Sequence, residues 1–159
     1  MTLPIWRIAT DTRDYTADDL TGAGAKQTGG RWNHPDTPML YCASSIALAC
    51  LETMVHIAAG SLPLNRYLVR IDVPDDVWDG ARTLTAASAL AGWDALPEGR
   101  VSLDYGTQWA MSKSTALLCV PSVVVPEEWN VLVNPKHADA ARMTATKLRK
   151  WIYDARIWA

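Results

Sequence analysis

The sequence predicts a single α+β domain, spanning residues 1–159, with a mixed and mostly antiparallel sheet. The length of 159 residues fits one domain, which can bury roughly 70% of its unfolded surface. Runs with the alternation of β-strands occur together with one strongly apolar helical segment. Strands and helices follow one another without regular strand–helix–strand alternation, and this order favours an α+β domain over a parallel α/β sheet.

The clearest strand is Arg66–Val73, where every second residue from Tyr67 to Val73 is apolar or aromatic and Pro74 ends the run. Other runs of similar character also predict strands. They are Leu3–Ala9, Met39–Ala43, Ala116–Val120, Val123–Val125, Trp129–Val133 and Lys150–Trp158.

The clearest helix is Ile46–Ala59, with Ser44 and Ser45 as N-cap residues and Gly60 as the stop. Because it is apolar nearly all round, we expect it in the interior of the domain. Two further segments are predicted to be helical, and two are predicted to be irregular. The helical ones are Asp104–Lys113 and Ala138–Leu148; Thr21–Gly30 is a small-residue loop, and Thr83–Ser102 is a mixture of loops and short helices.

Composition excludes several classes of function. The chain carries 15 basic and 17 acidic residues, without the clustered basic excess of a nucleic-acid-binding protein. There is no N-terminal signal pattern, and no apolar run approaches the ~20 residues that span a bilayer. Cysteine and histidine spacing predicts no disulfide and no metal site, so we expect a cytoplasmic protein without a membrane segment. Eight Trp and no Phe suggest that several indoles lie at the edge of the core or line a groove.

Glu52 is the most informative polar residue, because it lies on the otherwise apolar helix. A carboxylate there is costly to bury and must reach water, a partner or a ligand. The alternative is an ion pair with His56, four residues later. The helix alone leaves both interpretations open.

Two arginines are candidates for binding an anion. Arg31 follows Gly29 and Gly30, which allow the backbone to approach a ligand, and its planar guanidinium suits a diphosphate. A surface turn with an exposed arginine would have the same sequence. Arg7, in the first predicted strand, points either to solvent or inward as a second anion contact.

Tyr41 and Ser122 are weaker candidates. Tyr41 ends the strand that leads into the apolar helix and therefore lies near its N-terminus, or is simply a half-buried core tyrosine. Ser122 follows Pro121, which interrupts a strand pattern. A hydroxyl at such a break faces a cleft or belongs to a bulge.

The order of these residues along the chain resembles the RES family, named for an Arg, a Glu and a Ser. The resemblance covers nearly the whole chain and is weakest over Thr83–Ser102. The matching blocks are Trp6–Ile8, Leu20–Gly24, Gly29–Asn33, Met39–Ser44, Ala47–Glu52, Val120–Pro126, Asn130 and Asn134–His137. By this match the family residues are Arg31, Glu52 and Ser122, and Arg7 and Tyr41 are further site residues.

The resemblance implies a domain similar to ADP-ribosyltransferase toxins, paired with an Xre-type helix-turn-helix antitoxin and self-associating into a homodimer. It implies a toxin that depletes NAD⁺ by cleaving the nicotinamide–ribose bond, with NAD⁺ as substrate and with no cofactor or metal. Some relatives instead transfer ADP-ribose to a protein, which is the nearest alternative. A non-catalytic interaction module with a Trp-rich interface is the second alternative.

The candidate residues can support such a cleavage. Nicotinamide leaves a pyridinium as a neutral molecule, so the reaction needs no general acid, and one carboxylate can stabilise the oxocarbenium-like ribose. On this hypothesis Glu52 binds the ribose, Arg31 and Arg7 hold the diphosphate, Tyr41 packs against nicotinamide, and Ser122 orients the nicotinamide end. Water, phosphate and a protein side chain remain open as acceptors of ADP-ribose.

Overall fold

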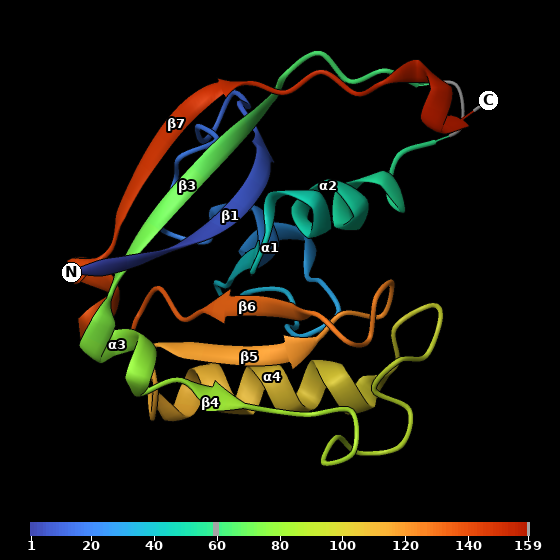
Figure 1. Cartoon of the computed structure of the whole chain (residues 1–159). Coiled ribbons are helices and arrows are strands. Elements are labelled where there is room, and N and C mark those ends of the chain that lie inside the picture. Colours follow the sequence, from blue (N-terminus) through green and yellow to red (C-terminus); the bar gives the residue numbers. More distant parts are fainter. Residues whose placement is uncertain (59–60, 159) are drawn as a thin grey trace.

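The computed structural model describes residues 1–58 and 61–158, and its centre is a seven-stranded sheet in the order β4-β5-β6-β2-β1-β3-β7 (Figure 1). The strands are β1 (Thr2–Thr10), β2 (Leu40–Ala43), β3 (Arg66–Pro74), β4 (Arg82–Thr83), β5 (Leu117–Pro121), β6 (Trp129–Val133) and β7 (Thr144–Lys150). The helices are α1 (Ala23–Thr28), α2 (Ile46–Met54), α3 (Asp75–Asp79) and α4 (Arg100–Ser112), with 3₁₀ turns η1 (Ala138–Arg142) and η2 (Ala155–Trp158).

Strand pairing in the sheet is mixed. Strand β4 runs parallel to β5, whereas each of the other neighbouring pairs is antiparallel. The predicted α+β class with a mixed, mostly antiparallel sheet is therefore confirmed.

The sheet opens between β1 and β2. Strand β1 pairs with β3 along its whole length, from Thr2 opposite Pro74 to Thr10 opposite Arg66, but it pairs with β2 only at Trp6 and Ala43. Beyond that point β1, β3 and β7 diverge from β6, β5 and β4, and α2 lies on the side where they separate (Figure 1). Beyond the last shared residue pair, the facing edges of β1 and β2 are no longer covered by each other and border the space between them.

Three apolar clusters hold these elements together. The largest lies on one face of the sheet and includes Ile5, Ile71, Leu117 and Val131. A second joins α4 and the segment before it to β5 and β6, and a third joins α2 to β1 and β3. Buried or half-buried indoles contribute to all three, as the composition suggested. They are Trp6, Trp32, Trp78, Trp93, Trp109, Trp129 and Trp151.

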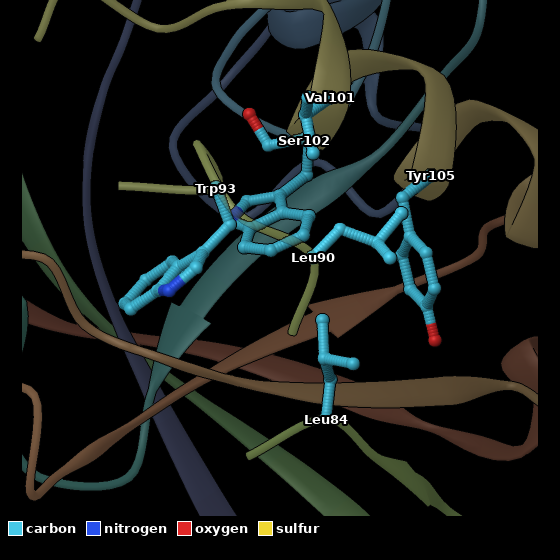
Figure 2. Close-up of a pocket in the computed structure, with 7 residues that line it drawn as sticks. Leu84, Leu90, Trp93, Val101, Ser102 and Tyr105 are labelled. Atoms are coloured by element: carbon cyan, nitrogen blue, oxygen red, sulfur yellow. The ribbon is translucent and has the colours of Figure 1, made fainter. Parts of the chain in front are cut away.

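The weakly patterned segment before α4 is fixed by apolar contacts. Leu84, Leu90 and Trp93 meet Val101 and Tyr105 of α4 (Figure 2). Trp32 stacks on Trp93 with ring centroids 6.4 Å apart. This contact leaves no space for a water molecule, so it anchors the segment rather than forming a site.

Helix α4 begins four residues before the predicted start at Asp104, and it lies very close to the loop after α1. A Cβ atom at Gly106 would lie 1.9 Å from the carbonyl oxygen of Trp32. Only glycine permits this approach, so α4 directly supports the residue that follows Arg31.

The prediction for the helix at Ile46 is confirmed at its start and wrong in its length. The Ser45 hydroxyl caps it by accepting a hydrogen bond from the Leu48 N–H at 3.1 Å, but the helix ends at Met54. The expected end at Ala59 and stop at Gly60 lie outside the described residues. The helix is also not interior: Leu48 and Ala49 are buried against the sheet, whereas Val55, directly after it, is 58% exposed.

The predictions for the C-terminal third are wrong in three places. Ala138–Leu148 is not a helix but η1 followed by β7, because the edge of β3 is available for pairing. The predicted strand Lys150–Trp158 is absent: Lys150 is the last residue of β7, and Ala155–Trp158 forms the 3₁₀ turn η2. The predicted strand Val123–Val125 is a bend. A fourth difference lies near the N-terminus, where the predicted loop Thr21–Gly30 contains the short helix α1.

Candidate active site

A cavity of about 930 Å³ opens where β1 and β2 diverge. Its walls come from β1, β2, α1, α2 and the loops before β2 and after β5. This volume is at the upper end of the range for small-molecule sites, roughly 300–1,000 Å³, and is large enough for a dinucleotide. Four of the five candidate residues line it: Arg7, Arg31, Tyr41 and Glu52.

Glu52 projects from α2 into this cavity and is held by one of its two carboxylate oxygens. Oε1 accepts a hydrogen bond from the Ser122 hydroxyl at 2.5 Å and another from the Asn130 amide at 2.9 Å. Oε2 accepts none from the described residues. The alternative pairing with His56 is not present among the described side chains; Glu52 is bonded instead to Ser122, which follows β5, and to Asn130 of β6.

Ser122 is fully buried and acts on Glu52 rather than on the cavity itself. Its hydroxyl donates to Glu52 and accepts from the N–H groups of Val124 and Val125, both at 3.1 Å. A hydroxyl has one proton, and Ser122 directs it into the hydrogen bond to Glu52. The sequence left open whether the Ser122 hydroxyl faces a cleft or belongs to a bulge. In the structure it lies in a tight turn after Pro121 and supports the Glu52 carboxylate.

Arg31 lines the cavity and also ties two loops together. Its Nη1 donates to the carbonyl oxygens of Trp93 and Ala95, at 3.1 and 2.8 Å. The remaining nitrogens of the guanidinium make no hydrogen bond to the described residues. Arg31 is therefore oriented by the segment before α4 while part of its donor fork stays available to an anion.

Arg7 lies on β1 at the cavity wall, beside Cys42 of β2. Its Nε atom is buried and has no hydrogen-bond partner within residues 1–58 and 61–158. Burial raises the pKa of the Cys42 thiol to about 11, an effect that the nearby Arg7 guanidinium partly offsets. Of the two orientations considered for Arg7, the inward one is observed.

Tyr41 lines the cavity, but its hydroxyl serves the Arg31 loop. It donates to Asn33 Oδ1 at 2.5 Å and accepts from the Trp32 N–H at 2.9 Å. Burial raises the pKa of this phenol well above its ordinary value, so it remains a donor. A Cβ atom at Gly30 would lie 2.7 Å from the same hydroxyl, so this glycine lets the loop close onto Tyr41.

Two asparagines complete this arrangement and were not singled out as site residues from the sequence. Asn33 is fully buried and donates to the carbonyl oxygens of Ala25 and Thr37, which fixes the loop that carries Arg31. Asn130 holds Glu52. A polar side chain inside the apolar strand Trp129–Val133 was the available signal, because asparagine is disfavoured in strands.

The described residues contain no group of three or more His, Cys, Asp or Glu side chains that could hold a metal ion. The three cysteines are free, two of them buried. None of the described helices is long and apolar enough to cross a membrane.

Comparison with known proteins identifies the family. The model of the RES domain matches residues 4–155. The chain belongs to the RES domain family. This RES domain is 60% identical over 157 residues to a protein of Sphingobium sp. (strain YBL2) named "Prs ADP-ribosylating toxin", covering 99% of this chain and 98% of that protein.

More distant relatives of the RES domain carry the name "Toxin Res". The protein of Yersinia enterocolitica serotype O:8 is 40% identical over 79% of this chain and 80% of its own, and that of Pseudomonas putida is 34% identical over 86% and 87%. Among solved structures, a chain of the Mycobacterium tuberculosis MbcT–MbcA toxin–antitoxin complex matches with a TM-score of 0.65. That match has 18% identity and covers 99% of this chain and 87% of that one, and it confirms the fold.

Proposed function

We propose that this RES domain is a toxin that breaks the nicotinamide–ribose bond of NAD⁺ and transfers the ADP-ribosyl group to a protein. The observation that carries the proposal is the state of Glu52. One carboxylate oxygen is held by Ser122 and Asn130, and the other is left for a ligand in a cavity that Arg7 and Arg31 also line.

The chemistry needs little more than this. When the C–N bond breaks, its electron pair leaves with nicotinamide, which becomes neutral and takes no proton. Positive charge develops on the ribose, and a carboxylate fixed by two donors before the reaction stabilises it without reorganising. Arg7 and Arg31 hold the diphosphate, because half-buried guanidinium groups with unused donors favour a doubly charged anion.

The acceptor is inferred from the relatives. The resemblance in sequence implies NAD⁺ depletion first, with protein modification as the nearest alternative. The 60% identical relative is named for ADP-ribosylating Prs, and it aligns with almost the whole chain. We therefore infer that a protein nucleophile, of which Prs is the first candidate, bonds to the ribose carbon and loses its proton. Transfer to water or phosphate is the competing outcome.

An antitoxin partner is part of the proposal. A solved structure with the same fold is half of a toxin–antitoxin complex, and three of the relatives are named as Res toxins. An Xre-type antitoxin, a homodimer and a cytoplasmic location remain predictions from the family resemblance. Co-expression with the neighbouring open reading frame tests the first, and sedimentation of the purified chain tests the second.

The decisive experiment uses purified protein, NAD⁺ labelled on the adenosine, and purified Prs. We expect nicotinamide release together with label on Prs, and Glu52→Gln should lower both about 100-fold or more. The Gln oxygen can still accept from Ser122 and Asn130, so the fold should be kept. Glu127→Gln, at an exposed position, is the matched control. Nicotinamide release with only free labelled product would assign water or phosphate as acceptor, and no release would overturn the proposal.

A further inference from the structure

Asn130 lines the cavity from a strand that is paired on both sides. It is the second residue of β6, and its backbone pairs with Ala43 on one side and Val120 on the other. Its side chain crosses to α2 and donates from Nδ2 to Oε1 of Glu52 at 2.9 Å. A side chain fixed at both ends in this way can present its remaining atom in a defined direction.

That remaining atom is the amide oxygen. Oδ1 of Asn130 is buried and has no hydrogen-bond partner among the described residues, although Asn130 lines the cavity. Exchanging the oxygen and nitrogen of the amide would not improve matters, because Oδ1 would then face the carboxylate oxygen of Glu52, acceptor against acceptor. The hydrogen bond to Glu52 therefore sets the orientation and leaves a buried acceptor without a donor among the described residues, which is unfavourable unless a ligand supplies one.

Glu52 contributes a second free acceptor at the same place. Both of its hydrogen bonds fall on Oε1, so Oε2 is available in the same cavity. Two neighbouring acceptors without donors of their own are complementary to two neighbouring donors on a ligand. A ribose offers such a pair in its vicinal 2′- and 3′-hydroxyl groups.

We propose that Asn130 recognises one hydroxyl of the nicotinamide ribose through Oδ1, next to the hydroxyl bound by Glu52, while its Nδ2 positions Glu52. This inference rests on the proposed function in taking NAD⁺ as the substrate. Asn130 thus has two separable roles: its oxygen discriminates a ribose with both hydroxyls, and its nitrogen orients the carboxylate.

Binding measurements separate the two roles. The probe is carba-NAD⁺, a non-cleavable analogue with a carbocycle in place of the nicotinamide ribose ring, together with its two monodeoxy forms. We expect Asn130→Ala to weaken binding of the complete diol about tenfold, the loss of one hydrogen bond. One monodeoxy analogue should bind the wild type and Asn130→Ala equally, because the group that Asn130 contacts is already missing.

The isosteric variant Asn130→Asp tests the nitrogen. It keeps an acceptor at Oδ1 but replaces the donor to Glu52 with a second carboxylate oxygen. We expect the wild-type ratio between the dissociation constants of diol and deoxy analogues, together with a turnover of NAD⁺ at least about tenfold slower. Asn65→Ala is the control, since the amide of Asn65 donates only to the Asp11 carbonyl, on an exposed loop.

The outcomes are distinct. Equal binding of the diol by the wild type and Asn130→Ala, or an equal loss with both monodeoxy analogues, would overturn the role of Oδ1. A wild-type rate in Asn130→Asp would overturn the role of Nδ2. Failure of the proposed function would look different, because the wild type would then neither bind carba-NAD⁺ nor release nicotinamide from NAD⁺.

Discussion

At the scale of single residues, the proposed site divides the two oxygens of one carboxylate between structural hydrogen bonds and a ligand. Oε1 of Glu52 is fully used by Ser122 and Asn130, and Oε2 is free. A carboxylate on a helix end with no such partners would sample several rotamers, and the reacting ribose would have to select one of them. Fixing the side chain in advance removes that cost from the reaction.

Ser122 should therefore behave as a positioning residue. Ser122→Ala removes one donor to Glu52 and the acceptor of two backbone N–H groups, so we expect about 10- to 100-fold slower nicotinamide release. The free energy of unfolding should fall by about 1–3 kcal/mol. Ser102→Ala is the matched control, because Ser102 is equally buried but does not line the cavity, and among the described residues its hydroxyl makes only one long hydrogen bond, to the Gly99 carbonyl at 3.5 Å. Full activity in Ser122→Ala, measured beside this control, would contradict the assignment.

The sequence could predict part of this site. A lone carboxylate on an apolar helix was conspicuous, and the resemblance supplied its partner Ser122. It could not indicate that the hydroxyl of Ser122 points at Glu52 rather than at nicotinamide, because that depends on the turn that places two N–H groups on the same oxygen. Asn33 and Asn130 were missed for a similar reason: their partners lie on other elements, and nothing local in the sequence reports such contacts.

At the scale of elements, the loop between α1 and β2 is held from several sides. Tyr41 and Asn33 fix it from within, α4 presses on Trp32 through Gly106, and Arg31 reaches across to the segment before α4. Through these contacts the hydroxyl of Tyr41 supports the backbone next to Arg31, ten residues earlier. The loop therefore holds the Arg31 guanidinium in one position.

Tyr41→Phe tests whether the Tyr41 hydroxyl supports the loop that carries Arg31. It leaves the buried oxygen of Asn33 and the N–H of Trp32 without their partner, and we expect a loss of roughly 1–3 kcal/mol in the free energy of unfolding. Because Arg31 then loses its fixed position, KM for NAD⁺ should rise more than kcat falls. If Tyr41 served mainly by packing its ring against nicotinamide, Phe would preserve activity, and steady-state kinetics would show it.

Tyr105→Phe is the control for that measurement. The ring of Tyr105 meets Trp32 edge-on with centroids 6.2 Å apart, and its hydroxyl makes no hydrogen bond to the described residues. Removing this hydroxyl should change the free energy of unfolding by no more than about 0.5 kcal/mol. A loss as large as that of Tyr41→Phe would mean that any change near Trp32 disturbs the loop.

The edge strand β7 illustrates what the sequence alone could not settle. Ala138–Leu148 contains four Ala together with Arg142, Met143, Lys147 and Leu148, and local propensity therefore favours a helix. The structure instead pairs Thr144–Lys150 with β3, and Ala145 and Lys147 alternate in burial with their exposed neighbours. Pairing with a distant strand outweighed local preference. The strand predictions Leu3–Ala9, Arg66–Val73, Ala116–Val120 and Trp129–Val133 were confirmed, because their alternation or burial is matched by pairing with neighbouring strands.

An ion pair between β7 and the loop after β1 predicts how the stability of the fold changes at acidic pH. Lys147 donates to both carboxylate oxygens of Asp11 at 2.9 Å. This hydrogen bonding, together with the N–H of Ala17, lowers the pKa of Asp11 below its ordinary value. The folded chain then binds this proton less readily than the unfolded chain, so the stabilisation is complete at neutral pH and is lost as the pH falls below about 4.

Asp11→Asn should consequently be less stable than the wild type at pH 7, and the difference should shrink towards pH 3. Urea unfolding at a series of pH values measures it. Asp14→Asn, on the same exposed loop and without an ion pair to any described residue, should show no such convergence. A constant difference between Asp11→Asn and the wild type across this range would mean that the ion pair contributes nothing to the pH dependence.

At the scale of the whole molecule, the cavity exists because the sheet is incompletely closed. A single residue pair, Trp6 with Ala43, joins β1 to β2, and beyond it the two halves of the sheet diverge. Arg7 belongs to one half, Tyr41 to the other, and Glu52 to the helix that covers the opening. A dinucleotide bound there would contact all three and replace the strand pairing that is missing.

A ligand that bridges the two halves should stabilise the entire fold. We expect NAD⁺ at about 100 times its dissociation constant to stabilise Glu52→Gln, which binds without cleaving, by about 2.7 kcal/mol. For a chain of this size that corresponds to a rise in Tm of about 5–10 °C, measurable by circular dichroism. Adding Arg7→Gln should remove most of the rise, because the diphosphate then loses the guanidinium whose buried Nε has no other partner among the described residues, whereas Arg13→Gln on an exposed loop should leave it unchanged. An unchanged Tm for Glu52→Gln in saturating NAD⁺ would show that the opening between β1 and β2 is not where the dinucleotide binds.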